Sequence, residues 1–313
     1  MPGNDPNCEG MVTQMSIVVT TPTGNIGSGV ARRLLDAGES VTLLARSPER
    51  LDADVRGRAV VKQGDLTDAA FVAAATEGAE AVFWLTPSDI AAPDARAWYE
   101  ALAVSARAAG QRSARVVNLS SAGAHRPAGA GPVSLLQIVE NALNETGAAV
   151  THLRPGYFFE NYLEQAGGIA QAGSVFLPVP EDCALPMVAT RDIAEVAAAR
   201  LRDRSWRGVS YRGLHGPRTL TFGEAAAEIS AALGRPVRHV TIDADQARDV
   251  FLSLGASPDF AQRYLEMFAA FAALPGEAIA AEPRTAETTT PTTLRAWASE
   301  ILKPAVESAG TAA

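Results

Sequence analysis

Short apolar runs alternate with helical patterns through the first half of this 313-residue chain. Six of these runs predict buried strands, and they span residues 16–21, 40–45, 59–62, 81–85, 115–119 and 149–153. Strands that are apolar on both faces and separated by helices are typical of a parallel sheet covered on both sides. Right-handed crossovers then give an α/β fold with a doubly wound, Rossmann-type sheet.

The pattern loosens after Arg154 and Pro155. We expect helices at about 191–203, 221–233, 243–254 and 257–272, with strands near 174–177, 208–212 and 237–241. The order Thr221-Phe222-Gly223-Glu224 is a capping box, and both Ser257-Pro258 and Thr290-Pro291 place proline just after a helix cap. The Thr-rich segment 283–290 is predicted to be a surface loop.

This pattern divides the chain into a Rossmann domain and a smaller C-terminal lobe. The Rossmann domain is predicted to span 15–156, with 186–211 returning to it, and the lobe to comprise 157–185 and 212–313. Residues 1–14 are polar and are predicted to be a disordered tail. Met11 and Met15 are equally good candidates for the true start of the protein.

Composition excludes several classes of partner. A formal net charge of -8 argues against nucleic acid, whose affinity depends on Lys and Arg contacts to phosphates. The sequence has no long basic run for a membrane surface and no apolar run of the roughly 18 residues that a membrane span needs. With Cys8 and Cys183 as its two cysteines, the chain is expected to work in the reducing cytoplasm without a disulfide framework.

The segment Thr21-Pro22-Thr23-Gly24-Asn25-Ile26-Gly27 joins the first predicted strand to a helix. Free N–H groups and the dipole at such a helix start favour a pyrophosphate. Gly24 lets the backbone approach the phosphates, and Gly27 lets the helix lie close to the sheet. Thr21 occupies the place of the usual first glycine, which we expect to require a negative φ there. The alternative is a purely structural turn.

The end of the second predicted strand indicates which dinucleotide binds. A carboxylate there would bind the ribose 2′-OH of NAD, whereas this chain has Arg46 and Ser47, which suit the 2′-phosphate of NADP. We therefore predict that NADP(H) is preferred, with NAD(H) possible. In the alternative, Arg46 is a solvated cation and Ser47 caps the turn at Pro48–Leu51. Asp65 is either an adenine partner or a turn residue ahead of a Thr67 cap.

Seven motifs then follow one another in a familiar order: GNIGSGVARRLLDAGESVTLLARSPERL, GDLTD, VFWLTP, VVNLSSAGA, THLRPGYFFEN, RDIAEVAA and FGEAAAEISAALGRPV. In these motifs the chain resembles the NmrA-like, atypical branch of the short-chain dehydrogenase/reductase family, from about residue 15 to 303. That branch includes reductases of triphenylmethane dyes and quinones as well as NADP-sensing proteins with no known turnover. The departure from the family pattern is Thr21.

The resemblance implies roles for matching positions. Thr86 and Pro87 would lie beside the nicotinamide ribose, Ser120 and Ser121 at the nicotinamide end of the fifth strand, and the Pro155-Gly156 backbone beside the carboxamide. Tyr157, Phe158, Phe159 and Asn161 would begin the substrate lobe. The complete set of predicted cofactor contacts is Thr21, Thr23, Gly24, Asn25, Ile26, Gly27, Arg46, Ser47, Asp65, Leu66, Leu85, Thr86, Pro87, Ser120, Gln137, Pro155 and Gly156. In the alternatives, Thr86-Pro87 only ends a strand and Phe158 or Phe159 is core.

Most relatives that act on alcohols and ketones use a Tyr-x-x-x-Lys pair, and this chain has none. Its tyrosines are 99, 157, 162, 211 and 264, and no lysine lies four residues after any of them. The two lysines, Lys62 and Lys303, do not suit the helix that carries the pair in the family. Where many family members have a lysine on that helix, this chain has Leu136, beside Gln137.

Three residues are candidate proton donors in place of the missing pair. His125 follows the Ser120-Ser121 pair on a loop, and Tyr157 and Ser121 are the other candidates; the alternative for His125 is an exposed loop residue. Losing a positioned acid costs about 10²–10⁴ in rate. His152 lies inside a predicted strand and is expected to be buried core. His215 and His239 show no metal-ligand spacing with Cys183, so we predict no metal.

The function that these features favour is NADPH-dependent reduction of a planar aromatic, quinone-like or enone small molecule by direct hydride transfer. The rival hypotheses are a non-catalytic NADP(H)-binding redox sensor and a cofactor-assisted non-redox enzyme, an isomerase or coupling enzyme. A pocket for a planar molecule would use some of the aromatic residues Trp98, Tyr99, Tyr157, Phe159, Phe268 and Phe271, which in the alternative are core. We expect a monomer or homodimer.

Overall fold

A seven-stranded parallel sheet forms the centre of the protein in the computed structural model, which describes residues 16–126, 128–274 and 276–311. The strand order is β10-β6-β5-β4-β1-β2-β3, and every neighbouring pair is parallel. The strands are β1 (Ile17–Thr20), β2 (Val41–Ala45), β3 (Val60–Gln63), β4 (Ala79–Leu85), β5 (Ser113–Leu119), β6 (Ala149–Pro155) and β10 (Val209–Leu214). The six predicted strands and the predicted fold class are confirmed, whereas the predicted tail at 1–14 lies outside the described residues.

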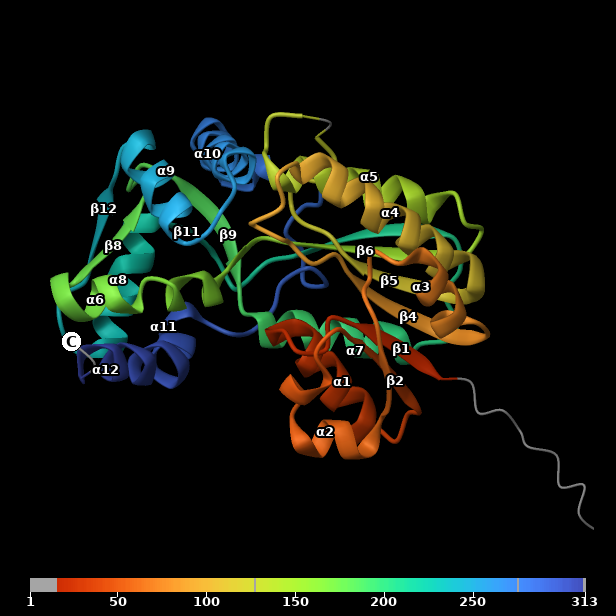
Figure 1. Cartoon of the computed structure of the whole chain (residues 1–313). Helices are drawn as coiled ribbons and strands as arrows, with labels where there is room; N and C mark the ends of the chain where they lie inside the picture. Colours follow the sequence, from red (N-terminus) through yellow and green to blue (C-terminus); the bar gives the residue numbers. More distant parts are fainter. Residues whose placement is uncertain (1–15, 127, 275, 312–313) are drawn as a thin grey trace, which may run out of the picture.

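Helices cover both faces of this sheet (Figure 1). One face carries α1 (Asn25–Asp36) and α7 (Thr190–Arg202), with the short α2 (Ala53–Arg58) beside α1, and the other carries α3 (Ala69–Thr76), α4 (Ala95–Arg112) and α5 (Pro132–Asn144). Successive residues of β1 alternate between the two cores, since Ile17 and Val19 pack towards α1 and Val18 packs towards α4. No helix in the described part of the chain is long and apolar enough to span a bilayer.

The C-terminal lobe has two small sheets and a core of its own. One sheet consists of β7 (Tyr157–Phe158), β9 (Ala184–Val188) and β11 (Thr219–Thr221), and the other of β8 (Ser174–Leu177) and β12 (Arg238–Thr241). The helices are α6 (Ala166–Ala172), α8 (Phe222–Leu233), α9 (Ala244–Ser253), α10 (Pro258–Ala273), α11 (Leu294–Trp297) and α12 (Lys303–Thr311), and a 3-10 turn spans Phe159–Leu163.

The predicted helix starts of this lobe have mixed outcomes. Thr221 and Glu224 form the expected capping box, and Ser257 caps α10 by accepting a hydrogen bond from the Phe260 amide at 3.2 Å. The predicted cap at Thr290 is wrong, because the helix begins at Leu294 and Thr293 caps it. Thr290 is instead buried against β10, where its amide donates to the His215 carbonyl at 2.7 Å.

The segment predicted to return to the Rossmann part corresponds to α7 and β10. Helix α7 packs on α1, and β10 pairs with β6 and continues to Leu214. Strand β9, which ends at Val188, pairs with β7 and β11 instead. The division of the remaining chain into two domains stays a prediction.

A buried ion cluster joins the sheet to the segment that follows α10. Arg154 of β6 donates to both carboxylate oxygens of Glu140 on α5, at 3.0 and 2.6 Å, and to Glu282 at 2.7 Å. The three side chains are only 7%, 3% and 13% exposed, and the guanidinium lies 4.2 Å from the centre of the Tyr211 ring. Removing one partner of such a buried pair leaves an uncompensated charge, so this cluster fixes how β6 meets the lobe.

Candidate cofactor and acceptor site

The predicted cofactor residues lie along one edge of the large sheet. Most follow the carboxyl end of a strand, and the strands β3, β2, β1, β4, β5 and β6 are neighbours in that order. Asp65 and Leu66 follow β3, Arg46 and Ser47 follow β2, residues 21–27 follow β1, Leu85 to Pro87 end and follow β4, Ser120 follows β5, and Pro155 and Gly156 end and follow β6. Open α/β sheets bind their ligands at this edge.

The turn after β1 leaves the start of α1 open. Gly24 is the N-cap residue, with φ −90°, and no side chain caps the helix there. The first helical hydrogen bond runs from the Ser28 amide to the Gly24 carbonyl at 2.9 Å, so the amides of Asn25, Ile26 and Gly27 precede it. Because the first turn also carries no acidic residue, these donors and the helix dipole suit a pyrophosphate.

Thr21 adopts φ +49°, and no other non-glycine residue in the described chain has a positive φ. Our expectation of a negative φ at this position is therefore wrong. The cause is the close approach of Gly27, where an added Cβ would lie 2.2 Å from the Thr21 carbonyl oxygen. The Gly24 amide donates to the same oxygen at 3.2 Å. The backbone contacts within this turn thus hold a β-branched residue in the left-handed region, which is unfavourable for it.

Arg46 and Ser47 lie at the exposed end of β2. Arg46 is exposed, and its carbonyl accepts a hydrogen bond from the Gln63 side chain at 3.3 Å. Ser47 precedes the 3-10 turn Pro48–Arg50, but its hydroxyl makes no capping hydrogen bond, which contradicts the capping alternative. Both side chains therefore remain candidates for a 2′-phosphate.

Asp65 is a turn residue in the described structure. Its Oδ1 accepts from the amide and the hydroxyl of Thr67, both at 2.8 Å. The Thr67 amide is the main cause that holds the pKa of Asp65 below its usual value, and the Arg46 charge acts in the same direction. The Thr67 cap named in one of the alternatives is wrong, because Asp68 caps α3 by accepting from the amides of Ala70 and Phe71, both at 3.0 Å.

At the end of β5, on the same edge of the sheet, lies a buried hydroxyl without a hydrogen-bond partner. Ser120 is 4% exposed, and its Oγ has no hydrogen-bond partner among the described residues. By contrast, the Thr86 hydroxyl accepts from the Trp84 indole at 3.1 Å, and the Pro87 carbonyl accepts from the Trp98 indole at 2.8 Å. A buried polar atom without a partner is free to bond to a ligand group or to water. With the open start of α1, Ser120 makes the edge a good fit for a dinucleotide.

The Pro155-Gly156 backbone, which the resemblance puts beside the carboxamide, already makes hydrogen bonds within the protein. The Pro155 carbonyl accepts from the Ala122 amide at 2.8 Å, and the Gly156 amide donates to the Leu214 carbonyl at 3.0 Å. A Cβ on Gly156 would lie 2.1 Å from the Pro186 carbonyl oxygen, so only glycine allows this crossing of chains.

A cleft of about 210 Å³ opens beside these residues, between the sheet edge and the lobe. Its lining consists of Ser121, Ala122, Val133, Pro155, Gly156, Tyr157, Phe158, Asn161, Leu185, Pro186, Tyr264, Met267, Phe271 and Ile279. Three of the predicted substrate residues, Tyr157, Phe158 and Asn161, are among them. Phe159 is not among them: it is 1% exposed, and its ring packs 5.8 Å from the Trp297 ring.

Helix α10 supplies much of the cleft wall. Phe271 was a candidate from the sequence, whereas Tyr264 and Met267 were missed. Their spacing with Phe260 marks one apolar face of the helix, but such a face predicts burial and not which part of it borders a pocket. Trp98 and Tyr99, also candidates, pack instead in the core beneath α4.

Two tyrosines in the cleft hold their protons firmly. Burial raises the pKa of Tyr264 to about 12. Burial also raises the pKa of Tyr157 well above its usual value, and a hydrogen bond with Asn161 only partly opposes this shift. Edge-on contacts with Phe222 at 5.4 Å and Phe271 at 6.3 Å surround the Tyr157 ring. Both phenols are therefore neutral hydrogen-bond donors at physiological pH.

The remaining candidate donors are also poorly suited to strong acid catalysis. Burial, followed by the charges of Arg154 and Arg126, lowers the pKa of His125, so its imidazole is neutral at pH 7. Gln137 donates to the His125 carbonyl at 3.0 Å and thereby fixes that loop. Ser121 lines the cleft and donates to the Ala122 carbonyl at 3.2 Å.

Neither lysine of the chain reaches the cleft. Lys62 of β3 donates to the Ala75 carbonyl of α3 at 3.2 Å, and Lys303 begins α12 in the lobe. Neither belongs to the residues that line the cleft. The missing tyrosine-lysine pair is thus not replaced by a lysine from elsewhere in the described structure.

Comparison with known proteins identifies the class. A family model described as NAD(P)H-binding matches residues 22–204. A (4-alkanoyl-5-oxo-2,5-dihydrofuran-3-yl)methyl phosphate reductase of Streptomyces griseus is 37% identical over 252 residues, which are 80% of this chain and 85% of that protein. An NAD(P)H azoreductase of Xenophilus azovorans is 32% identical over 260 residues, 81% of this chain and 86% of that protein.

A solved structure shows the same fold. The NADPH-dependent quinone oxidoreductase of Escherichia coli, in complex with NADPH, superposes with a TM-score of 0.74 at 21% identity, over 91% of this chain and 99% of that chain. The chain belongs to the NAD(P)H-binding family, and its fold is also that of the solved structures of triphenylmethane reductase and NmrA. The predicted class, an NAD(P)H-dependent oxidoreductase, is confirmed.

We predict that Thr21→Gly stabilises the protein. Glycine adopts φ +49° without the strain that threonine carries there, whereas the more flexible unfolded chain offsets part of the gain. We expect the free energy of unfolding to rise by about 0.5–1 kcal/mol, measured by urea denaturation. An unfolding midpoint below that of the wild type would show that the threonine is not strained.

We predict opposite outcomes at the two glycines of the turn. A Cβ at Gly24 would meet only the Thr21 carbonyl, at an ordinary 3.7 Å, so Gly24→Val should remain folded but lose NADPH binding in calorimetry. A Cβ at Gly27 would lie 2.2 Å from the same oxygen, so Gly27→Ala should lower the unfolding midpoint. Wild-type NADPH affinity in folded Gly24→Val would place the cofactor elsewhere.

Proposed function

We propose that this protein is an NADPH-dependent reductase of a planar, electron-poor small molecule, such as a quinone, an aromatic azo compound or a conjugated enone. The observation that carries the proposal is the aromatic cleft of about 210 Å³ at the carboxyl ends of β5 and β6. It adjoins the buried, unsatisfied hydroxyl of Ser120, where the family resemblance puts the nicotinamide.

The cleft suits a flat acceptor that carries no charge. Its size admits a ring system of modest size, and Tyr157, Phe158, Tyr264 and Phe271 present aromatic surface to it. No Arg, Lys or His is among the residues described as lining it. An uncharged acceptor therefore fits this cleft better than a phosphorylated one, although the Streptomyces griseus relative is named for a phosphate ester.

Bound NADPH would supply a hydride from C4 of its nicotinamide to the acceptor. The chain's own residues would hold the acceptor in the cleft, exclude water from it and donate hydrogen bonds through the phenols of Tyr157 and Tyr264. Because both phenols keep their protons, the proton that completes the reduction would come later, from solvent water. An acceptor that stabilises the added negative charge suits such a site, and a simple ketone does not.

The names of the relatives support this substrate class. The dihydrofuranone of the Streptomyces griseus enzyme contains a carbon–carbon double bond conjugated to carbonyl groups, and the Xenophilus azovorans enzyme is named for azo compounds. These acceptors are planar and electron-poor. We propose a cytoplasmic enzyme that is a monomer or homodimer. A sensor without turnover and a non-redox enzyme are the rival outcomes of the tests below.

Arg46→Ala should discriminate between the two dinucleotides. Arg46 would give the 2′-phosphate a charge-assisted hydrogen bond, so its loss should weaken NADPH binding about tenfold or more and leave NADH binding nearly unchanged. Calorimetry with both cofactors measures this. The control is Arg107→Ala, which removes an exposed arginine of α4 that pairs with Glu145. Equal losses for both cofactors would contradict the assignment of Arg46.

The proposed chemistry predicts a pattern of substrates and variants. Quinones and conjugated enones should be reduced with NADPH consumption, whereas simple aliphatic ketones should not.

His125→Ala and Tyr157→Phe should each lower kcat by less than about 100-fold, because neither residue is an essential acid. The rate should also stay level between pH 7.5 and 8.5, since the pKa of His125 lies below its usual value and leaves the imidazole neutral throughout this range.

NADPH deuterated at C4, on the face from which the hydride is transferred, separates the rival functions. Deuterium in the reduced product would support hydride transfer. A transformed acceptor without label transfer would establish the non-redox reading. Tight NADP(H) binding with no transformed acceptor in a broad panel, together with a cofactor-dependent change in affinity for a protein partner, would establish the sensor.

A further inference from the structure

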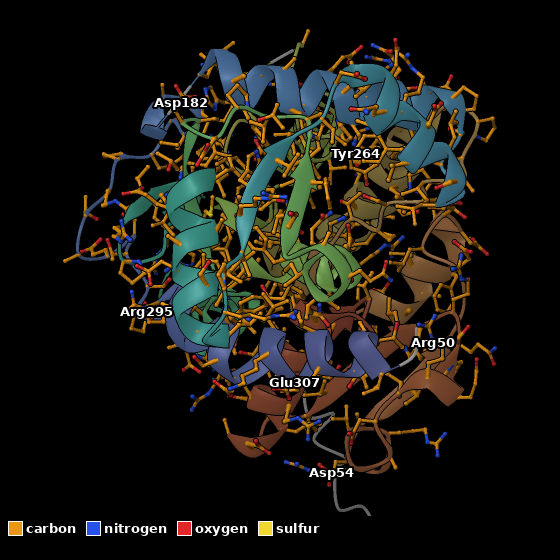
Figure 2. All side chains as sticks on the ribbon, turned by 90° about the vertical axis from the view of Figure 1, so that its left-hand side faces the viewer. Arg50, Asp54, Asp182, Tyr264, Arg295 and Glu307 are labelled. Carbon is orange, nitrogen blue, oxygen red and sulfur yellow. The ribbon has the colours of Figure 1, made fainter. Side chains whose placement is uncertain are left out.

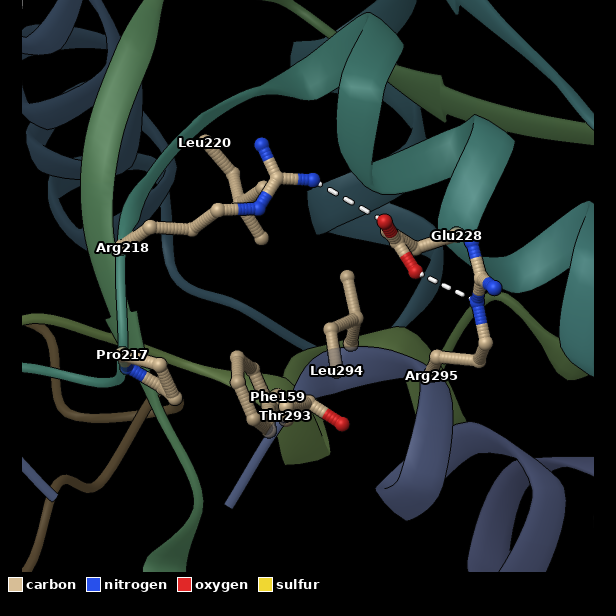
Figure 3. Close-up of a pocket in the computed structure, with 8 residues that line it drawn as sticks. All are labelled: Phe159, Pro217, Arg218, Leu220, Glu228, Thr293, Leu294 and Arg295. Carbon is tan, nitrogen blue, oxygen red and sulfur yellow. Dashed lines mark hydrogen bonds and ion pairs between the residues drawn. The ribbon is translucent and has the colours of Figure 1, made fainter. Parts of the chain in front are cut away.

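A second and larger cavity, of about 390 Å³, lies within the C-terminal lobe (Figure 3). It is lined by Phe159, Pro217, Arg218, Leu220, Glu228, Thr293, Leu294 and Arg295, and none of these residues lines the acceptor cleft. They come from the turn after β7, from β11 and the residues before it, from α8 and from the start of α11. A cavity of this size is typical of small-molecule sites.

The base of this cavity is apolar and firmly packed. Phe159, Leu220 and Leu294 are 1%, 4% and 2% exposed. The Phe159 ring packs 5.8 Å from the Trp297 ring, and the Trp297 indole is fixed by a hydrogen bond to Glu160 at 3.0 Å. Because these side chains are already ordered, little conformational entropy is lost when a ligand binds, which favours affinity.

One wall is charged. Glu228 lies between two arginines and pairs with each through a different oxygen, with Arg218 Nη2 at 2.9 Å and with Arg295 Nε at 2.7 Å. Figure 3 shows the two guanidinium groups on either side of this carboxylate, with Leu294 and Phe159 below it. Glu228 is 21% exposed, whereas the arginines are 52% and 59% exposed, so the guanidinium groups form the rim.

The two arginines are not equally satisfied. Arg218 also pairs with Glu224, through Nη1 at 3.3 Å, and therefore faces two carboxylates. Arg295 donates only through Nε in the described structure. A guanidinium carries five N–H donors, so the terminal nitrogens of Arg295 retain four without an acceptor among the described residues. This is the geometry that binds a carboxylate with two parallel hydrogen bonds.

We propose that this cavity is a second ligand site, which binds a small carboxylate with a flat or branched apolar body. The body would lie on Phe159, Leu220 and Leu294, and the carboxylate would pair with the terminal nitrogens of Arg295. Glu228 keeps both of its partners and fixes the two arginines in place.

This site is separate in space from the acceptor cleft, but one of its residues is next in sequence to residues that line the cleft. Tyr264 of the cleft and Arg295 of the cavity lie well apart in Figure 2. Phe159, however, directly follows β7, whose two residues Tyr157 and Phe158 line the cleft. Because the two sites share no lining residue, the ligand should bind without competing with an acceptor.

The test uses 2-naphthoate as the probe and 2-naphthamide as its uncharged match, in calorimetry with the full chain and no cofactor. We expect 2-naphthoate to bind at least tenfold more tightly than the amide, because only the carboxylate forms charge-assisted hydrogen bonds. Arg295→Gln should weaken 2-naphthoate binding about tenfold or more. The control Arg248→Gln removes an exposed arginine on α9 that is paired with Asp245 and should change nothing.

Three results would overturn the proposal: equal affinity for acid and amide, unchanged affinity in Arg295→Gln with a wild-type unfolding midpoint, or displacement of 2-naphthoate by the quinone menadione. If Arg295→Gln does not fold, the acid–amide ratio and the menadione competition on the wild-type chain still decide. None of these measurements requires turnover, so the second site stands or falls independently of the reductase function.

Discussion

The parallel alignment of all seven strands in the large sheet is the constraint on which the site depends. It brings the carboxyl ends of strands that are far apart in sequence to a single edge, and the loops there carry most of the predicted cofactor residues. The open start of α1 with Gly24 lies near the middle of this edge, and the unsatisfied hydroxyl of Ser120 lies two strands away. A dinucleotide spans such a line because its charged and polar parts are spaced along its length.

The acceptor cleft requires a second constraint, because one of its walls belongs to the lobe. The Arg154 cluster supplies part of it, since it links β6 and α5 to Glu282 in the segment beyond α10. A buried arginine with two carboxylates tolerates little displacement, because breaking either pair leaves a charge without compensation. Gly156 adds a steric requirement at the same point, where the chain crosses β9 in contact with the Pro186 carbonyl. Together they fix where Tyr157 enters the cleft.

The sequence predicted the large sheet well because each of its strands is apolar on both faces, a signal that needs no tertiary information. It failed where close backbone packing, or a residue that is unusual for its element, decides the local structure. Thr21 adopts a positive φ because Gly27 packs on its carbonyl, and β9 was missed because Pro186 interrupts its strand pattern. For the site, the loops after the strands could be predicted from their order, but the share of Tyr264 in the cleft could not, because an apolar helix face looks alike in a core and beside a pocket. The cavity at Arg295 gave no local signal at all.

The missing tyrosine-lysine pair acquires a physical meaning from the surroundings of the cleft. In enzymes with the pair, lysine lowers the pKa of tyrosine so that the phenol gives up its proton as charge develops on the substrate. Here burial has the opposite effect on Tyr157 and Tyr264 and keeps both phenols protonated. Such groups stabilise an anion by hydrogen bonding but transfer a proton poorly. The rate then depends on how well the acceptor itself carries the added charge, and a quinone or conjugated enone spreads that charge over several atoms. The same apolar surroundings that prevent acid catalysis also strengthen each hydrogen bond to the developing anion, so the cleft selects its substrates by their electron affinity and not by an alcohol or ketone group.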